Sequence, residues 1–481
     1  MRGLLGLDVR ETHRVRRWDA VVVGGALPGL VAAARLAMRG AQVLVIEEDS
    51  AVAAFAGLTE PFLMTGAAND SVLSACLSAI GIPLIDRRNL ASEPLAYQVA
   101  WPGARVNIGG LERTADEIEC WGLAESQLSR NLLSALEASA AAEGTRLLAS
   151  RLASATRRGP RRTCFMSRSQ TSADAAADRD VEDAIAAAPT LAPLIDAQSR
   201  ALADFGRCAP GAAARNRLLG AALSGAVMVS GKDPWFASLL RQRIEARHGE
   251  FRRLSGTFRI VQTGNLPALA ADESRDVSAA RALIINAPTS SLVDMGCHTG
   301  GNTGSETGNT QTADCWLHGS APTGRKLRLH LRGSRELLPA GMASRVICVR
   351  DASAPMNGTN VVRVRIFQSG DEVDLVADSS GPFEALDAER ALEEIRRSVV
   401  SLMPLGDEGW LRIAVPVPLW DRSDLLSDPS ETDSEPIPGL RRPLSRVPAY
   451  ILDRSQSARR GFEGDLLLGW QAGDAIATEL G

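Results

Sequence analysis

The run WDAVVVGGALPGLVAAARL, at Trp18–Leu36, places a strand pattern, a glycine-rich turn and a helix pattern directly after one another. Gly40 predicts the end of that helix, and AQVLVI at Ala41–Ile46 predicts a second buried strand, closed by Glu47 and Glu48. Two continuous apolar strands on either side of a helix are typical of a βαβ unit with parallel strands, because such strands need cover on both faces.

The turn itself, Gly24-Gly25-Ala26-Leu27-Pro28-Gly29, has the spacing of a dinucleotide-binding turn, with Ala26 at the central position. Its first glycine allows a tight turn, and its last lets helix and strand pack closely. The helix N-terminus would present N–H groups to a pyrophosphate, and Pro28 suits the first helical turn. Glu47, about 20 residues further on, would accept hydrogen bonds from adenosine ribose hydroxyls and repel a 2′-phosphate. A turn that only packs is the other interpretation.

Length and composition indicate a globular protein with more than one domain. The chain has 481 residues, 45% hydrophobic and 23% charged, which predicts roughly two to four domains. Its formal net charge of -4 does not indicate nucleic-acid binding. The seven cysteines form no C-x-x-C pair, so reduced thiols and a cytoplasmic location are expected, without a metal site. Arg16 and Arg17 are compatible with peripheral membrane contact, and a solvated tail explains them equally well.

The rest of the chain predicts alternating helical and sheet regions. The expected elements are a hairpin at Tyr97–Ile108, helices over 111–143, 181–223, 235–248 and 386–402, strands at 258–261, 282–288 and 465–469, antiparallel sheet over 326–378, and a short helix ending at Leu480. Stretches without periodicity predict loops over 155–180, 296–312 and 424–448.

In this order the features resemble the FAD-dependent oxidoreductases of the phytoene desaturase and flavin amine oxidase superfamily. The resemblance is carried by the N-terminal turn, the Tyr97–Ile108 hairpin, Ala282–Pro288, Pro416–Asp421 and Leu466–Asp474. It implies an α/β fold, in which a discontinuous Rossmann-like FAD-binding domain holds an inserted α+β substrate domain with an antiparallel sheet. The implied boundaries are an N-terminal tail at 1–18, FAD-binding segments at 19–92, 225–295 and 441–481, and substrate-domain segments at 93–224 and 296–440.

The resemblance also implies an activity, namely a dehydrogenase or desaturase that takes hydride from a C–H bond of an apolar small molecule. FAD would be held at two motifs: Gly24, Gly25, Ala26, Leu27, Pro28, Gly29, Glu47 and Glu48 in the first, and Gly469, Trp470, Gly473 and Asp474 in the second. Two registers remain open for the second motif, with either Gly469-Trp470 or Asp474 beside the ribityl chain. No catalytic residue is singled out.

Two departures from the family pattern favour other functions. Ala26 replaces a glycine at the position where the backbone approaches the phosphates, so its Cβ would crowd the ligand. Asp49–Gly57 lacks the arginine that the family usually has after its acidic residue. Together with the long polar inserts, these departures motivate a second hypothesis, a cofactor-free scaffold that serves as a binding or assembly protein. A third, an NAD-dependent dehydrogenase, explains the first motif but not the C-terminal one.

Overall fold

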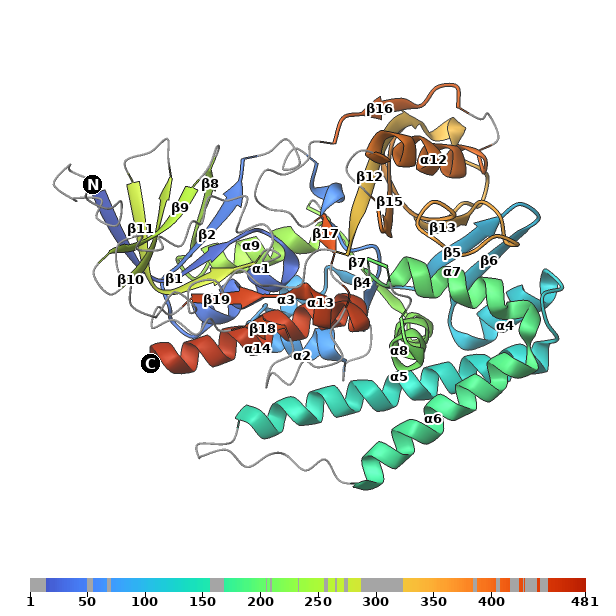
Figure 1. The fold of residues 1–481 in the computed structure, drawn as a ribbon, viewed down its shortest axis with the longest axis horizontal. Helices are drawn as coiled ribbons and strands as arrows, with labels where there is room; N and C mark the ends of the chain where they lie inside the picture. The colour runs from blue at the N-terminus through green and yellow to red at the C-terminus, as the bar shows by residue number, and fades with distance from the viewer. Residues whose placement is uncertain are drawn as a thin grey trace, which may run out of the picture.

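The computed structural model describes most of the chain. The described residues are 14–49, 55–66, 71–155, 168–204, 206–207, 210–231, 233–254, 258–263, 266–271, 276–286, 323–383, 387–403, 407–415, 424–426, 428, 439–441 and 449–481. They form a mixed α/β architecture in which two large sheets lie side by side (Figure 1).

The first sheet is mainly parallel and is built around the N-terminal strand. Its order is β18 (Leu440–Arg441), β19 (Ala449–Leu452), β11 (Asp276–Ile285), β1 (Arg14–Val23), β2 (Val43–Glu48) and β8 (Glu250–Leu254), with β10 (Leu266–Ala271) and β9 (Phe258–Thr263) continuing antiparallel from β11. The βαβ unit and the returning strand near residue 282 are therefore confirmed. Arg16 and Arg17, expected in a tail, lie within β1, where Arg16 is 3.6 Å from Glu250.

Both faces of this sheet are covered, which explains the continuous apolar strands. Ala20 and Val22 of β1 pack beneath α1 (Leu27–Met38), α9 (Phe236–Glu245) and α14 (Gly461–Leu480). Val21 and Val23 face the other way and cluster with Leu269 of β10. Alternate residues of one strand thus belong to two different cores.

The second sheet is mainly antiparallel and joins two distant parts of the chain. Its order is β16 (Leu411–Ile413), β12 (Gly324–Ser334), β15 (Glu372–Gly381), β14 (Val361–Ser369), β13 (Arg345–Val349), β5 (Leu95–Trp101) and β6 (Ala104–Gly109), with β17 (Leu425–Leu426) beside β12. The amphipathic helix α12 (Ala388–Val400) covers one face, with Ile395 and Val399 in the core. The predicted hairpin and antiparallel sheet are both confirmed.

The remaining elements are a small sheet and a helical layer. The small sheet has the order β3 (Met64–Thr65), β7 (Ala226–Val229), β4 (Leu90–Glu93). The remaining helices are α2 (Val72–Ala79), α3 (Leu84–Arg87), α4 (Leu111–Cys120), α5 (Ser126–Ala155), α6 (Arg168–Ala187), α7 (Ala192–Leu202), α8 (Ala212–Leu223) and α13 (Arg454–Ser457), with short 3₁₀ turns at Ala56–Leu58, Pro189–Leu191, Arg335–Leu337 and Ala458–Arg460. Figure 1 shows α5 and α6 as a long pair below the second sheet. Across the described part of the chain, no helix has the length and apolar character needed to cross a membrane.

Several local predictions were wrong. The helix expected over 111–143 is divided into α4 and α5, and Gly122 between them has a φ of +66°. Part of the loop expected over 155–180 belongs to α6. The strand expected over Asp465–Gly469 lies inside α14, where three consecutive leucines pack in a helix. The 296–312 insert and Pro416–Asp421 lie outside the described residues.

Helix α14 packs against α1 through glycines and an ion pair. A Cβ at Gly469 would overlap the backbone oxygen of Pro28, and one at Gly473 would lie 2.8 Å from the Arg35 Cβ. Asp474 accepts a hydrogen bond from Arg35 Nε at 2.7 Å. Small residues here let the two helices approach closely, so this contact fixes α14 against the dinucleotide-type helix.

Gly469→Ala should therefore lower the free energy of unfolding by about 1–3 kcal/mol, because an added methyl group forces the two helices apart. Urea denaturation would measure the change. Gly144→Ala is the matched control, since Gly144 also lies inside a helix, α5, and a Cβ there makes only an ordinary contact with the Arg217 side chain at 3.5 Å. A Gly469→Ala protein as stable as the control would contradict the proposed close contact.

Candidate functional site

The turn between β1 and α1 is fixed by Asn286, the residue that directly follows the distant strand β11. Asn286 donates its backbone N–H to Val23 O at 2.8 Å and its Nδ2 to Ala26 O at 2.8 Å. Gly24 has a φ of +100°, and a Cβ there would come within 2.7 Å of Asn286 O. Gly24 is therefore required by both backbone conformation and space. A Cβ at Gly29 would overlap the Asn286 side chain, which confirms close packing at the last glycine of the motif.

Ala26 occupies the central position without backbone strain. As the N-cap of α1 it has a φ of -68° and a ψ of 157°, an extended conformation open to any residue. No side chain caps the helix, so the N–H groups of its first turn have no side-chain acceptor. The helix start is thus suited to an anionic group, as the spacing predicted.

At the end of β2, Glu47 is buried and forms an ion pair with Arg241 of α9. Its carboxylate lies over Gly25, where a Cβ would collide with it. Arg241 also stacks on Phe251 of β8, with its guanidinium 4.8 Å from the ring centroid. Arg241 therefore places a basic side chain beside Glu47. The family usually has this arginine shortly after the acidic residue, and Asp49–Gly57 contains none.

A cavity of about 450 Å³ extends from this turn to the second sheet. Its first part is lined by Gly25, Ala26, Leu27, Glu47, Glu48, Arg241 and Arg253. Its far part is lined by Asp204, Lys326, Arg328, Arg363, Arg365 and Asp378, and its sides include Glu60, Phe62, Phe236, Arg454, Phe462 and Asp465. A volume in this range is typical of small-molecule sites.

The structure places some of the predicted site residues at the cavity and others away from it. Gly25, Ala26, Leu27, Glu47 and Glu48 come together at the cavity, while Gly24, Pro28 and Gly29 support the turn through packing. Gly469, Trp470, Gly473 and Asp474 lie along α14, none of them among the residues that line the cavity. The earlier part of the same helix lines it instead, with Phe462 and Asp465.

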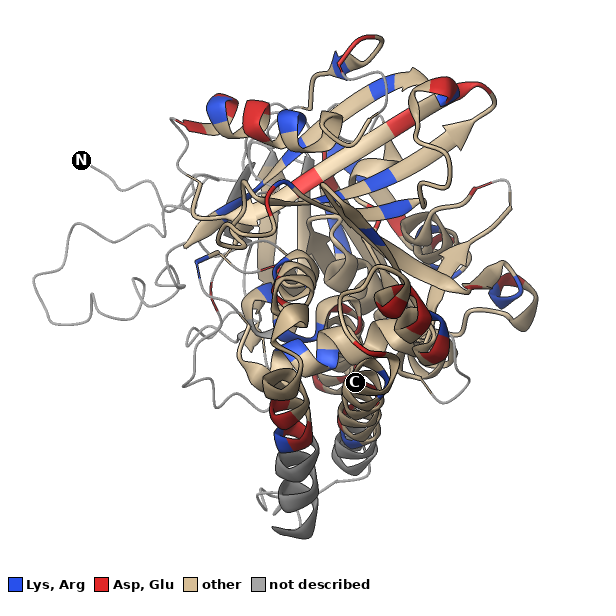
Figure 2. Cartoon of the chain, turned by 90° about the vertical axis from the view of Figure 1, so that its right-hand side faces the viewer, with Lys and Arg blue, Asp and Glu red and all other residues tan. Residues whose placement is uncertain are grey.

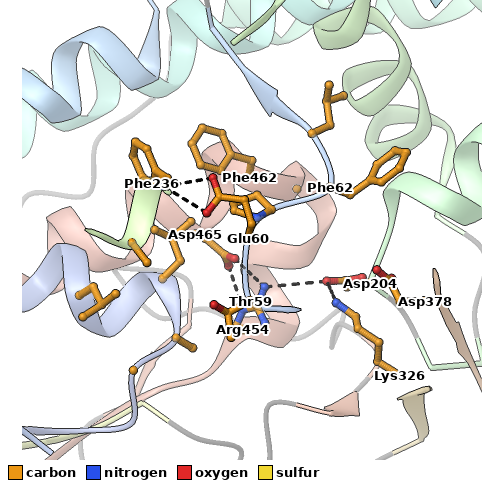
Figure 3. A pocket seen from close by; sticks show the side chains of 18 of the residues that line it. Thr59, Glu60, Phe62, Asp204, Phe236, Lys326, Asp378, Arg454, Phe462 and Asp465 are labelled. Atoms are coloured by element: carbon orange, nitrogen blue, oxygen red, sulfur yellow. Dashed lines mark hydrogen bonds and ion pairs between the residues drawn. The ribbon is translucent and has the colours of Figure 1, made fainter. Parts of the chain in front are cut away.

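The segment between β19 and α14 is the C-terminal contribution that the sequence analysis missed. Arg454, directly after the strand and Asp453, forms an ion pair with Asp465 at 2.6 Å and approaches Asp204 at 3.9 Å (Figure 3). The signal was present, because Ala449–Leu452 followed by Asp453 repeats the pattern of an apolar strand closed by an acid, as in β2 and Glu47.

The charged part of the cavity was also missed. Asp204 accepts from Lys326 Nζ at 2.6 Å and from Arg363 Nη1 at 2.9 Å, and Asp378 accepts from Arg363 Nε at 2.7 Å. Burial alone would raise the pKa of both carboxyl groups, but the neighbouring cations outweigh it and hold both values below the usual range. Both aspartates are therefore ionised at neutral pH. The resemblance implied an apolar substrate, and this charged lining does not match one.

Glu60 is a titratable group on the side of the cavity. Its carboxylate accepts a hydrogen bond from the backbone N–H of Phe236 at 3.1 Å, at the start of α9 (Figure 3). Burial raises the pKa of Glu60 to about 7, opposed by the Phe236 hydrogen bond and the charge of Arg365. The side chain is therefore partly protonated near neutral pH, which suits proton transfer.

Glu60 should make the stability of the folded protein depend on pH. Because its pKa rises from 4.5 to about 7 on folding, its contribution is fully present below about pH 4.5 and is lost as the pH rises through 7. Glu60→Gln should therefore become more stable relative to wild type between pH 5 and 8, by about 2–3 kcal/mol. Urea denaturation across this range measures the difference, with exposed Glu389→Gln as the control. A constant difference for Glu60→Gln would contradict the raised pKa.

Comparisons with known proteins identify the fold. No protein-family model matches the sequence, and no curated protein is significantly similar to it. An oxidoreductase from Methanosarcina mazei has a TM-score of 0.53 at 14% identity, over 95% of this chain and 99% of that one. The PF1083 protein from Pyrococcus furiosus has a TM-score of 0.52 at 14% identity, over 97% and 98%. A triple mutant of putrescine oxidase, made to redesign cofactor binding, has a TM-score of 0.50 at 14% identity, over 97% and 100%. This chain therefore has the mixed α/β, Rossmann-like fold of these proteins.

Proposed function

We propose that the chain is an FAD-dependent oxidoreductase that removes hydride from a C–H bond of a small-molecule substrate. The observation that carries the proposal is the cavity itself, because it joins a dinucleotide-type turn and its acidic residue to the face of a second sheet. An oxidoreductase and a putrescine oxidase with the same fold agree with it. A phytoene desaturase-like activity has no separate support.

The residues present fit the dinucleotide end of FAD. The uncapped start of α1 can bind the pyrophosphate, and Ala26 presents its backbone there without strain. Glu47 can accept hydrogen bonds from the adenosine ribose, and its contact with Arg241 holds the carboxylate over Gly25. When bound, the flavin supplies the two-electron acceptor for the substrate hydride. The second sheet would limit access of water to the other end of the cavity.

The second hypothesis, a cofactor-free scaffold, loses one of its motives. Ala26 was its first motive, because a Cβ there would crowd the phosphates; the backbone of Ala26 is unstrained, and the FAD titration tests the crowding. The missing arginine was its second, and Arg241 and Arg253 line the cavity close to Glu47. The test below distinguishes the two hypotheses directly.

Glu47→Gln should weaken FAD binding by about tenfold or more, since charge-assisted hydrogen bonds contribute about 1.5–3 kcal/mol each. Titration of the flavin-free protein with FAD, followed by flavin fluorescence, gives the affinity. Glu250→Gln on the neighbouring strand β8 is the control, because that side chain is exposed. Equal affinity in both variants would overturn the assigned role of Glu47, and a wild-type protein that binds no FAD would favour the scaffold.

A further inference from the structure

Four cations and two carboxylates form a charged cluster on one face of the second sheet, defined here as Lys326, Arg328, Arg363, Arg365, Asp204 and Asp378. Five of the six come from adjacent strands, and Asp204 follows α7. Asp378 of β15 lies opposite Arg328 of β12 on one side and opposite Arg363 of β14 on the other. The residues between them, Leu327 in β12 and Val364 in β14, pack on the opposite face in the α12 core. Figure 2 shows basic and acidic positions along these strands.

The ion pairs within the cluster leave positive charge uncompensated. Asp204 is shared by Lys326 and Arg363, and Asp378 is shared by Arg363 and Arg365. The Arg328 side chain makes no hydrogen bond or ion pair with any residue that the structure describes, and its buried Nε has no partner. Four cations therefore face two carboxylates.

Other acidic groups around the cavity are already engaged. Asp465 pairs with Arg454, and Glu47 pairs with Arg241. Glu60 accepts from Phe236, and its pKa of about 7 reduces its average negative charge at neutral pH. None of these carboxylates forms an ion pair with Arg328 among the described residues. The charge of Asp424 also acts on Arg328, but the two side chains form no ion pair.

Burying more cations than carboxylates is costly, so the excess of positive charge in the cluster needs an explanation. The Arg365 side chain is only 5% exposed, and its buried Nε has no hydrogen-bond partner. The Lys326 side chain is 9% exposed. Burial lowers the pKa of Lys326 to about 8 and that of Arg365 to about 10, the direction expected where positive charges are gathered away from water. An anion in the cavity would supply the missing partner.

We propose that Lys326, Arg328 and Arg365 form a subsite that binds a carboxylate or phosphate group of the substrate. The inference rests on the proposed function, for which it names the substrate class: a small molecule with an anionic oxygen group. Figure 3 shows Lys326, Asp204 and Asp378 at one end of the cavity and Glu60 and Phe236 at the other. The three cations belong to the second sheet, whereas the dinucleotide turn belongs to the first. We therefore assign them to the substrate rather than to the pyrophosphate of FAD.

Arg328→Gln is the variant that tests the subsite. Arg328 forms no ion pair with a described carboxylate, so replacing it breaks none of the ion pairs in the cluster. The probe is inorganic phosphate, titrated at constant ionic strength into the protein as purified and followed by calorimetry. We expect saturable binding in wild type and about tenfold or more weaker binding in the variant, with partial recovery in Arg328→Lys. The control is Arg412→Gln, an exposed arginine that pairs with Glu389 on the outer side.

Flavin content, measured on the same samples, separates the two proposals. Phosphate binding that depends on Arg328, with unchanged flavin content, supports the subsite. The same dependence in a protein without flavin supports the subsite and contradicts the proposed oxidoreductase. Phosphate binding that FAD displaces, or loss of flavin in Arg328→Gln, overturns the assignment to substrate. Absence of saturable phosphate binding in wild type, or equal binding in Arg328→Gln, overturns the subsite itself.

Discussion

The parallel pairing of β1 with β11 is the contact on which the cavity depends. It brings Asn286 against Gly24, 262 positions earlier in the chain. The Asn286 side chain can then donate a hydrogen bond to the backbone oxygen of Ala26. The turn is thereby fixed from outside its own segment, and its glycines, which have no Cβ, leave room for Asn286. Without that strand, the βαβ unit would keep its sequence of strand, helix and strand. It would lose the Asn286 hydrogen bonds that fix the start of α1.

The second sheet explains why the cavity has two different ends. Its strands alternate apolar residues, which pack beneath α12, with charged residues, which face the cavity. In a sheet with one face in solvent, the same alternation would leave those charges in water. Here the first sheet and its helices cover them, so ion pairs that would contribute little at a surface become strong constraints on what the cavity can bind.

Sequence patterns predicted the elements whose neighbours are local, including β1–α1–β2 and the Leu95–Gly109 hairpin. They failed at Leu466-Leu467-Leu468, because a short apolar run is equally compatible with a buried strand and a buried helix. The charged end of the cavity was missed for another reason. Arg363 and Arg365 alternate with valines as solvent-facing residues do, and only the tertiary fold shows that this face is covered. Arg454 could have been found from the strand and acid that precede it.

The most direct test of the central claim is the flavin content of the protein purified from its native host. After denaturation, the absorbance and fluorescence of the released material give the amount of flavin per chain. Our account predicts one FAD for each chain, because the turn, Glu47 and the second sheet enclose one continuous cavity. A colourless protein that also fails to take up added FAD would contradict it.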